Sequence, residues 1–397
     1  MPLPLADCAD RMLRRLAQRT GSAGLARING ATLLGERAML ANWVIPGELS
    51  AGAGCRLFDA VGDVVALNLA RPDDRDLLSA LFETDALDAR DDQAIAALIR
   101  TCDAGTLVMR GRSMGLAIAM EHETQPCLES VGVELAKGRP AGDDAGAARR
   151  APRILDLSAL WAGPLAAHLL WLAGGDVVKV ESRARPDAMR MGDEPFYALL
   201  NQGKASVVLD FADAGDRRAL LALIAASDIV IEAARPRALL QLGIDAARIV
   251  AMSPGLVWVT ITGHGAQGDA ADWVGFGDDC GVAAGLSAAL RAVSGRGGFV
   301  GDAIADPLTG IAAALLAWNA WKARQGGRFG VALSQVAAHC LAQARAHDPA
   351  ALSADLTAWS AAIGKPFPAV QRRTIGAAAA LGEHTRSRLA QISGESV

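Results

Sequence analysis

The sequence predicts an α/β protein with a Rossmann-like parallel-sheet domain and a smaller α+β domain in front of it. Three observations support this fold class: apolar strands alternate with helices from residue 153, the segment before them lacks apolar periodicity, and the first 136 residues have their own strand and helix pattern. A chain of 397 residues is long enough for about two hydrophobic cores. We therefore expect a small domain at 1–136, a linker at 137–152, a large domain at 153–345, and a C-terminal tail at 346–397 that packs on the large domain.

The front segment predicts a strand pair followed by helices. Alternating apolar residues place the strands at 54–58 and 63–68, and apolar residues at helical spacing place helices at 73–82 and 92–101. The linker reads KGRPAGDDAGAARRAP and mixes Gly, Pro, Ala and charged residues, as connecting segments do.

The large domain alternates strands and helices. The helices are expected at 164–173, closed by Gly174, at 212–226, and again up to about residue 252. Such alternation, with apolar strands, indicates a parallel sheet that is covered by helices on both faces. The expected strands are 153–157, 176–181, 205–210, 228–232 and 256–262.

Composition and missing motifs exclude several functions. The turn after the first large-domain strand reads SALWAGP over 158–164 and lacks G-x-G-x-x-G, and no Walker A string occurs, so NAD, FAD and ATP are disfavoured. The six cysteines are scattered without a CxxC pair, so we expect no disulfide framework, no metal and no tightly bound cofactor.

The charge balance and the N-terminus bear on partners and location. With 39 basic and 43 acidic residues and no long run of either sign, we expect no binding of nucleic acid or membranes. The N-terminus lacks the pattern of a signal peptide, and apolar runs such as 310–318 are too short to span a bilayer. A cytoplasmic protein with small-molecule substrates is expected.

Asp306 is the first candidate for chemistry. It precedes Pro307 at the head of an apolar helix expected at 307–324, so it is either a helix N-cap or a reactive carboxylate. A helix N-terminus favours the ionised form of a carboxyl, so the two interpretations are compatible. The same helix, with Trp318 and Trp321, suits either an interface or the core.

The string ILDLSALWAGPLAAHLLWLAGGDVVKVES, from Ile154 to Ser182, resembles the opening of the class III CoA-transferases, the CaiB/BaiF family that includes formyl-CoA transferase and acyl-CoA racemases. Further strings follow in the order found in that family. They are Asn201, Gly203, Lys204 and Leu209-Asp210; residues 228–232; Leu242-Gly243; 253–257; 260–265; Ala305-Asp306; and 381–385.

The order of the domains departs from the family's usual one. The family inserts its small domain after the catalytic half, whereas only about 341–382 lies there in this chain. Residues 50–57 resemble the family's Gly-rich loop, 62–67 resemble the strand after it, and 115–120 resemble a later segment. The small domain is therefore expected at the N-terminus, with a simple hairpin turn at 50–57 as the alternative.

The resemblance implies covalent transfer of CoA from an acyl-CoA to a carboxylic acid through an aspartyl-CoA thioester on Asp306. Oxyanion stabilisation needs closely approaching backbone N–H groups, for which Gly52 and Gly54 are the first candidates and 295–298 the second; either loop can also be only a turn. Coenzyme A and acyl-CoA are the implied substrates. The family also implies a homodimer with interlocked chains.

The resemblance also implies a CoA site. Trp161 is expected either to stack on adenine or to lie in the core. The other implied contacts are Ala162, Arg183, Leu209, Asp210, Arg235 and Arg237.

Two departures from the family pattern leave a second hypothesis open. Ala233 stands where the family has Asn, and Gln241 where it has a basic residue, so the alternative is a catalytically silent CoA-binding subunit or assembly partner. An acyl-CoA racemase is disfavoured because 275–279 contains no histidine; only His264 is available to substitute, and a structural role is expected for it.

Overall fold

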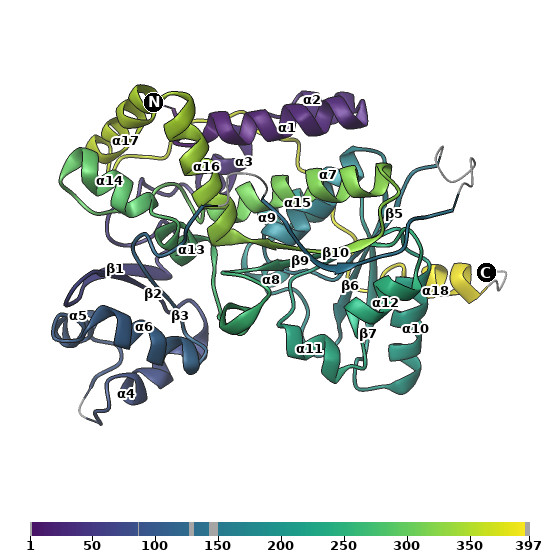
Figure 1. Cartoon of the computed structure of the whole chain (residues 1–397), viewed down its shortest axis with the longest axis horizontal. Coiled ribbons are helices and arrows are strands. Elements are labelled where there is room, and N and C mark those ends of the chain that lie inside the picture. The colour runs from purple at the N-terminus through teal and green to yellow at the C-terminus, as the bar shows by residue number, and fades with distance from the viewer. Residues whose placement is uncertain (1, 86, 127–130, 143–149, 394–397) are drawn as a thin grey trace.

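The computed structural model describes residues 2–85, 87–126, 131–142 and 150–393. Its centre is a seven-stranded sheet in the order β4-β10-β9-β8-β5-β6-β7, and a separate three-stranded sheet has the order β1-β2-β3 (Figure 1). Cys127 and residues 143–149 of the predicted linker lie outside the described residues.

Six strands of the large sheet are parallel, and β4 pairs antiparallel with β10 at one edge. Their side chains are mostly buried on both faces, which explains the apolar strands in the sequence. All five strands predicted for the large domain are confirmed. The strands are β4 (Val133–Lys137), β5 (Arg153–Asp156), β6 (Asp176–Ser182), β7 (Ala205–Leu209), β8 (Ile229–Glu232), β9 (Val257–Thr262) and β10 (Gly327–Ala332).

Helices cover both faces of the large sheet. One hydrophobic core joins the sheet to α7, α15 and α16, and a second joins the opposite face to α10, α11 and α12. Helix α15 is buried against α7 and α1, and Trp318 is only 4% exposed, so the helix belongs to the core. The helices are α7 (Ala162–Leu172), α8 (Met189–Gly192), α9 (Glu194–Asn201), α10 (Ala214–Ala225), α11 (Pro236–Gln241), α12 (Ala246–Met252), η2 (Gly268–Ala271), α13 (Gly277–Ala283), α14 (Leu286–Ser294), α15 (Ala305–Lys322), α16 (Leu333–His347), α17 (Pro349–Ala361) and α18 (Thr385–Ser393).

The N-terminal helices α1 (Ala6–Thr20), α2 (Ala23–Ala26) and α3 (Gly30–Leu40) pack on the large domain. Buried residues of this segment, such as Leu13 and Leu33, belong to the same core as α7 and α15. The first forty residues therefore share the core of the large sheet and not that of the three-stranded sheet. The predicted division of the whole chain into domains stays a prediction.

The three-stranded sheet and its helices form a smaller unit with a core of their own. Both strands predicted in the front segment are confirmed, and the third strand comes from 117–120. The elements are β1 (Cys55–Asp59), β2 (Val64–Asn68), η1 (Pro72–Leu77), α4 (Leu78–Leu81), α5 (Asp92–Ile99), α6 (Ala104–Ser113) and β3 (Ala117–Met120). In the described ranges, no helix combines the length and the apolar character needed to cross a membrane.

Candidate active site

The candidate site lies where the strand order of the large sheet reverses. From β5 the chain proceeds to β6 and β7, then returns to β8 on the other side of β5. The loops after β5 and β8 therefore diverge and leave a crevice at the carboxyl ends of the strands, which is the usual ligand position in open α/β sheets.

A cavity of about 290 Å³ occupies this crevice, and Asp306 lies in its wall. Asp306 is the one acidic side chain among the cavity residues that the structure describes. The wall is built from loops after β5 and β8, the end of β9 and the start of α15. It includes Ala159, Leu160, Ala162, Gly163, Ala233, Ala234, Arg235, Ile261, Thr262, Gly263, Trp273, Val274, Gly275 and Phe276.

Asp306 is in the first turn of α15 and is half-buried. The helix begins at Ala305, with Ile304 as its N-cap, so the predicted N-cap role of Asp306 is wrong. The helical backbone starts before the Asp-Pro pair, and accordingly the Asp306 N–H already donates to the Ala303 carbonyl at 2.9 Å.

The pKa of Asp306 is raised to about 7. Burial is the largest cause, and the carboxylates of Asp278, Asp279 and Asp302 add repulsion, whereas the Arg37 guanidinium opposes the rise. The sequence led us to expect that the helix terminus favours ionisation; burial and neighbouring carboxylates outweigh it. Near pH 7 the carboxyl is therefore divided between its ionised and protonated forms.

Arg37, from α3, is the cation that faces Asp302, Asp278 and Asp306. Its Nε donates to Asp302 Oδ2 at 2.9 Å, and a second guanidinium nitrogen bonds the other oxygen. The guanidinium also lies over the Trp161 ring, with 4.5 Å between its carbon and the ring centroid. No sequence signal linked Arg37 to Asp306, because 269 positions separate them and the two approach only through the packing of α3 beside α15.

Gly277 lets the backbone of α13 reach the Asp306 carboxylate. A methyl group on its Cα would overlap Asp306 Oδ2 and the Ala303 carbonyl oxygen. Any larger residue at this position would displace the carboxylate from its place in the cavity wall.

The predicted oxyanion loops lie outside the cavity wall. A methyl group on Gly52 would lie 3.4 Å from the Trp43 ring and 3.9 Å from Arg37, whereas one on Gly54 would meet Ala70 at 2.9 Å. In the second loop, the Gly298 carbonyl accepts a hydrogen bond from Ser287 Oγ at 2.9 Å. Gly52 thus approaches the Arg37 cluster, and the catalytic role of both loops stays a prediction.

The structure brings two of the predicted CoA-site residues, Ala162 and Arg235, into the cavity wall. Trp161 is only 2% exposed and packs edge-on against Phe196 with ring centroids 4.9 Å apart, which favours the core alternative over adenine stacking. Arg237 is exposed and pairs with Asp272 at 3.3 Å.

Three further predicted CoA contacts lie at the β6–β7 side of the sheet and do not line the cavity. The Arg183 N–H donates to the carbonyl of the buried Leu209 at 2.8 Å, while the Arg183 side chain is exposed. Asp210 accepts a hydrogen bond from the Ala212 N–H at 2.9 Å, which closes a turn. These contacts account for the three residues by local structure.

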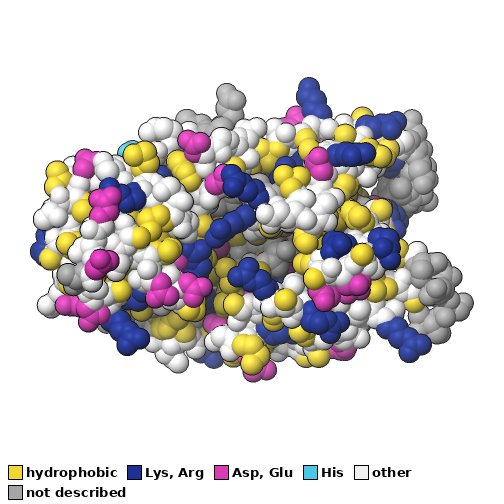
Figure 2. All heavy atoms as spheres, turned by 90° about the horizontal axis from the view of Figure 1, so that it is seen from below, with side chains coloured by type: hydrophobic (Ala, Val, Ile, Leu, Met, Phe, Trp, Pro, Cys, Tyr) yellow, Lys and Arg dark blue, Asp and Glu magenta, His cyan; other side chains and the backbone are white. Residues whose placement is uncertain are grey.

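A larger hollow of about 930 Å³ adjoins the cavity, because Arg235 and Trp273 line both. It runs between α6 of the small unit and α11 of the large domain, and its wall also includes Arg112, Arg237 and Gln241. Figure 2 shows a hollow between the two lobes of the molecule with Lys and Arg side chains around it. The Arg112 guanidinium stacks on Trp273, 3.9 Å from the ring centroid. The wall of the hollow thus carries three arginines, the carboxylates of Asp269 and Asp272, and one indole ring.

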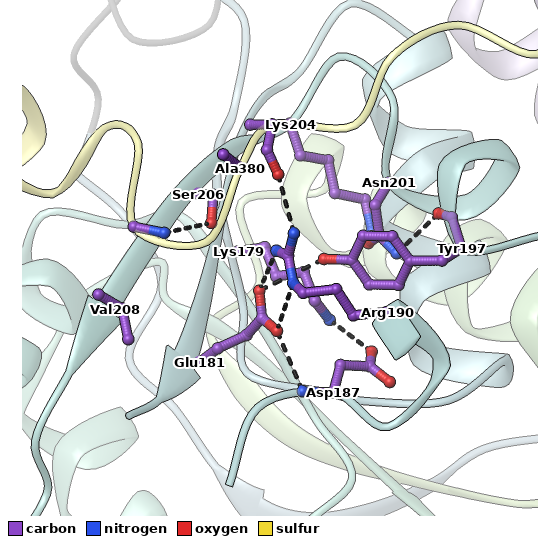
Figure 3. Close-up of polar contacts among 12 residues, drawn as sticks. Lys179, Glu181, Asp187, Arg190, Tyr197, Asn201, Lys204, Ser206, Val208 and Ala380 are labelled. Carbon is purple, nitrogen blue, oxygen red and sulfur yellow. Dashed lines mark hydrogen bonds and ion pairs between the residues drawn. The ribbon is translucent and has the colours of Figure 1, made fainter. Parts of the chain in front are cut away.

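A buried polar network holds the loop that follows β5 (Figure 3). Lys179 Nζ donates to the Ser158 carbonyl at 2.8 Å and to Asp187 Oδ2 at 3.0 Å, and Asp187 in turn accepts from the Leu160 N–H at 3.2 Å. Leu160 has a left-handed backbone, with φ of 68°, which costs a non-glycine residue free energy. The network thus stabilises a strained residue in the cavity wall.

Asn201 and Lys204, which carry part of the family resemblance, belong to the same buried region (Figure 3). Lys204 Nζ donates to Asp156 Oδ2 at 2.8 Å, to the Pro164 carbonyl at 2.9 Å and to Asn201 Oδ1 at 2.9 Å. Burial lowers the pKa of Lys204 to about 8, although Asp156 opposes this. These residues connect β5, α7 and α9 and do not line the cavity.

The chain matches one family of known proteins. The model of CoA-transferase family III matches residues 152–356. Succinate–glutarate CoA-transferase of Agrobacterium fabrum is 30% identical over 172 residues, which cover 40% of this chain and 43% of that protein. Succinyl-CoA–D-citramalate CoA-transferase of Chloroflexus aurantiacus is 32% identical over 184 residues, which cover 44% and 45%. The chain thus spans less than half the length of these curated relatives.

Two solved structures match part of the chain. The hypothetical protein Rv3272 of Mycobacterium tuberculosis has 24% identity and a TM-score of 0.46, with 51% of this chain and 61% of that chain covered. A CaiB/BaiF family protein of Brucella suis has 24% identity and a TM-score of 0.41, with 53% and 58% covered.

Proposed function

Because the chain belongs to CoA-transferase family III, we propose that it moves CoA from an acyl-CoA donor to a free carboxylic acid, with Asp306 as nucleophile. The observation that carries this proposal is the position of Asp306, the one described acidic side chain in the wall of a cavity at the switch point of the sheet.

The proposed reaction has two halves. An Asp306 carboxylate oxygen attacks the acyl carbonyl carbon, the carbon–sulfur bond breaks, and a mixed anhydride and CoA thiolate result. The thiolate then attacks the Asp306 carbonyl carbon, which releases the donor's carboxylate and leaves an aspartyl-CoA thioester. The acceptor carboxylate reverses these steps and leaves as the new acyl-CoA. No net charge or proton is consumed.

The surroundings of Asp306 suit this role. A carboxylate that is poorly solvated and near its pKa at neutral pH is a better nucleophile than one in water, because less hydration must be removed before attack. Gly277 admits the carboxylate close to the backbone, and the network under Leu160 holds another part of the cavity wall. The position of the carboxylate is thereby restricted.

We place the CoA moiety in the larger hollow. Arg235 stands where the cavity and the hollow join, and its guanidinium is the first candidate for a CoA phosphate, since Arg112 pairs with Glu123 and Arg237 with Asp272. Gln241 lines the same hollow in place of the basic residue expected from the family, and Ala233 lines the cavity in place of Asn. These substitutions motivate the alternative of a silent CoA-binding subunit.

A homodimer, a cytoplasmic location and an N-terminal small domain are also part of the proposal. The small unit contributes α6 to the hollow, so its position in front of the large domain still allows both to contact one ligand. Sedimentation analysis of the purified chain would establish the oligomeric state.

Peptide mass spectrometry after incubation with a panel of acyl-CoAs tests the chemistry, with hydroxylamine to trap acyl and thioester adducts. We expect a CoA or hydroxamate adduct on Asp306 and none in Asp306→Asn. Asp73→Asn is the control, since that carboxyl is exposed and does not line the cavity; this variant should retain the adduct.

Absence of an adduct with every donor, together with measurable CoA binding, would contradict the transferase and favour the silent subunit. An adduct that maps to a residue other than Asp306 would contradict the assigned nucleophile while leaving the transfer reaction in place.

A further inference from the structure

We propose that His264, Asp279 and Cys280 bind one transition-metal ion of the zinc class beside the Asp306 cavity. His264 follows β9, whereas Asp279 and Cys280 lie in α13, so the fold joins residues 15 and 16 positions apart. No spacing motif predicted this cluster, and the sequence led us to expect no metal. This proposal does not depend on the proposed transferase activity.

The three ligand atoms form a nearly equilateral triangle. His264 Nε2 lies 3.7 Å from Asp279 Oδ2, Cys280 Sγ lies 3.8 Å from His264 Nε2, and Cys280 Sγ lies 3.8 Å from Asp279 Oδ2. The point equidistant from them is about 2.2 Å from each, the edge divided by the square root of three; zinc bonds to S, N and O run from about 2.0 to 2.3 Å. A small cation fits there without movement of the ligands.

The 3.7 Å distance from His264 Nε2 to Asp279 Oδ2 is too long for an ordinary N–H···O hydrogen bond, which spans about 2.7 to 3.2 Å. The Cys280 thiol lies 3.8 Å from the same nitrogen and donates to the Gly263 carbonyl at 3.3 Å. Asp279 is fully buried, and among the described residues His264 is the one basic side chain within 4.0 Å of its carboxylate. A buried carboxylate needs a partner of opposite charge, and a metal ion would supply it.

The other carboxylate oxygen of Asp279 is held by neighbours, as metal-ligand carboxylates are. Asp279 Oδ1 accepts from Asn68 Nδ2 at 3.2 Å and from the Phe276 N–H at 3.0 Å, which leaves Oδ2 directed at the cluster. Because Asn68 lies in β2, the small unit also orients this ligand.

The cluster adjoins the Asp306 cavity through Gly275, which lines that cavity. A methyl group on Gly275 would lie 2.6 Å from Cys280 Sγ and 2.8 Å from His264 Nε2, so only glycine leaves room for both atoms behind the cavity wall. The thiol proton is released to solvent as the metal–thiolate bond forms, and a water molecule supplies the fourth ligand. One thiolate, one imidazole and one carboxylate suit zinc or cobalt.

Cobalt is the probe for this site, because a cobalt–thiolate bond absorbs in the near ultraviolet and can be titrated optically. After chelator treatment of the full chain, we expect one Co²⁺ per chain with a charge-transfer band. The band should be lost in Cys280→Ser and retained in Cys340→Ser, the same change at another buried cysteine. Asp279→Asn and His264→Gln keep the thiol and should weaken Co²⁺ binding by more than about a hundredfold.

Circular dichroism of each apo variant would report folding independently of the metal. If Cys280→Ser does not fold, the Asp279 and His264 variants decide the question. Wild-type protein without the band, a band unchanged in Cys280→Ser, or cobalt affinity unchanged in Asp279→Asn would each overturn the proposed site.

Discussion

Replacement of Asp306 by Asn should stabilise the protein at alkaline pH while abolishing the proposed chemistry. The pKa of Asp306 is about 7 in the folded protein, against an ordinary value of 3.8, so the folded chain holds the proton more tightly than the unfolded chain between these values. Stability from this group is therefore fully present below about pH 4 and is lost as the pH rises through about 7.

The magnitude follows from the same two values. The difference corresponds to about 4 kcal/mol at about 1.36 kcal/mol per pH unit. Asp306 is only half-buried and Asp278 titrates with it, so we lower this figure to about 2 to 4 kcal/mol. We therefore expect the change in unfolding free energy caused by Asp306→Asn to be more stabilising at pH 8 than at pH 4 by this amount.

Denaturant unfolding of wild-type and Asp306→Asn protein across this pH range is the assay, with the exposed Asp73→Asn as the charge-matched control. The difference between wild-type and Asp306→Asn should grow with pH, and adduct formation by the wild-type protein should rise through about pH 7 as the carboxylate ionises. A stability difference that is independent of pH, or that falls as the pH rises, would refute the raised pKa of Asp306 in the folded protein.

Three other predictions concern the neighbours of Asp306. Gly277→Ala should abolish the adduct because its methyl group overlaps the carboxylate, whereas Gly192→Ala, with open space around it, should not change adduct yield by mass spectrometry. Arg37→Gln should lower the free energy of unfolding by about 3 to 5 kcal/mol, since it leaves the buried Asp302 without its cation. A loss below about 1 kcal/mol in denaturant titration would contradict this role of the ion pair. Arg235→Ala should raise KM for acyl-CoA by at least about tenfold with little change in kcat. Arg237→Ala should raise KM by less, because Arg237 already pairs with Asp272. Equal KM values for Arg235→Ala and the wild-type protein would exclude Arg235 from the CoA site.

Local patterns in the sequence determined much of the fold. The five predicted strands of the large sheet lie within about two residues of the observed bounds, because apolar runs between turn residues depend mainly on neighbours in the chain. The helix after Asp306 was also predicted, although its first residue was placed two positions late. The antiparallel edge strand at 133–137 was not predicted, since its side chains are mostly exposed and it depends on pairing with β10.

The candidate site was only partly predictable. Asp306, Ala162 and Arg235 were singled out from the sequence and line the cavity, although their roles stay predictions, whereas Arg37, Trp273 and Gly277 carried no recognisable signal. Trp161 had two possible roles in the sequence, and its burial against Phe196 favours a place in the core.

The sequence by itself determined the order of the strands between residues 153 and 262, the family, and the carboxylate at the head of α15. Only the tertiary structure decided the environment of that carboxylate: Arg37 and the carboxylates of α13 and residue 302 converge on it from distant segments. The tertiary structure also places His264 Nε2 within 3.8 Å of Cys280 Sγ. The reason is physical, because electrostatic shifts and ligand geometry depend on distances of a few ångströms between segments, and local sequence patterns do not specify such distances.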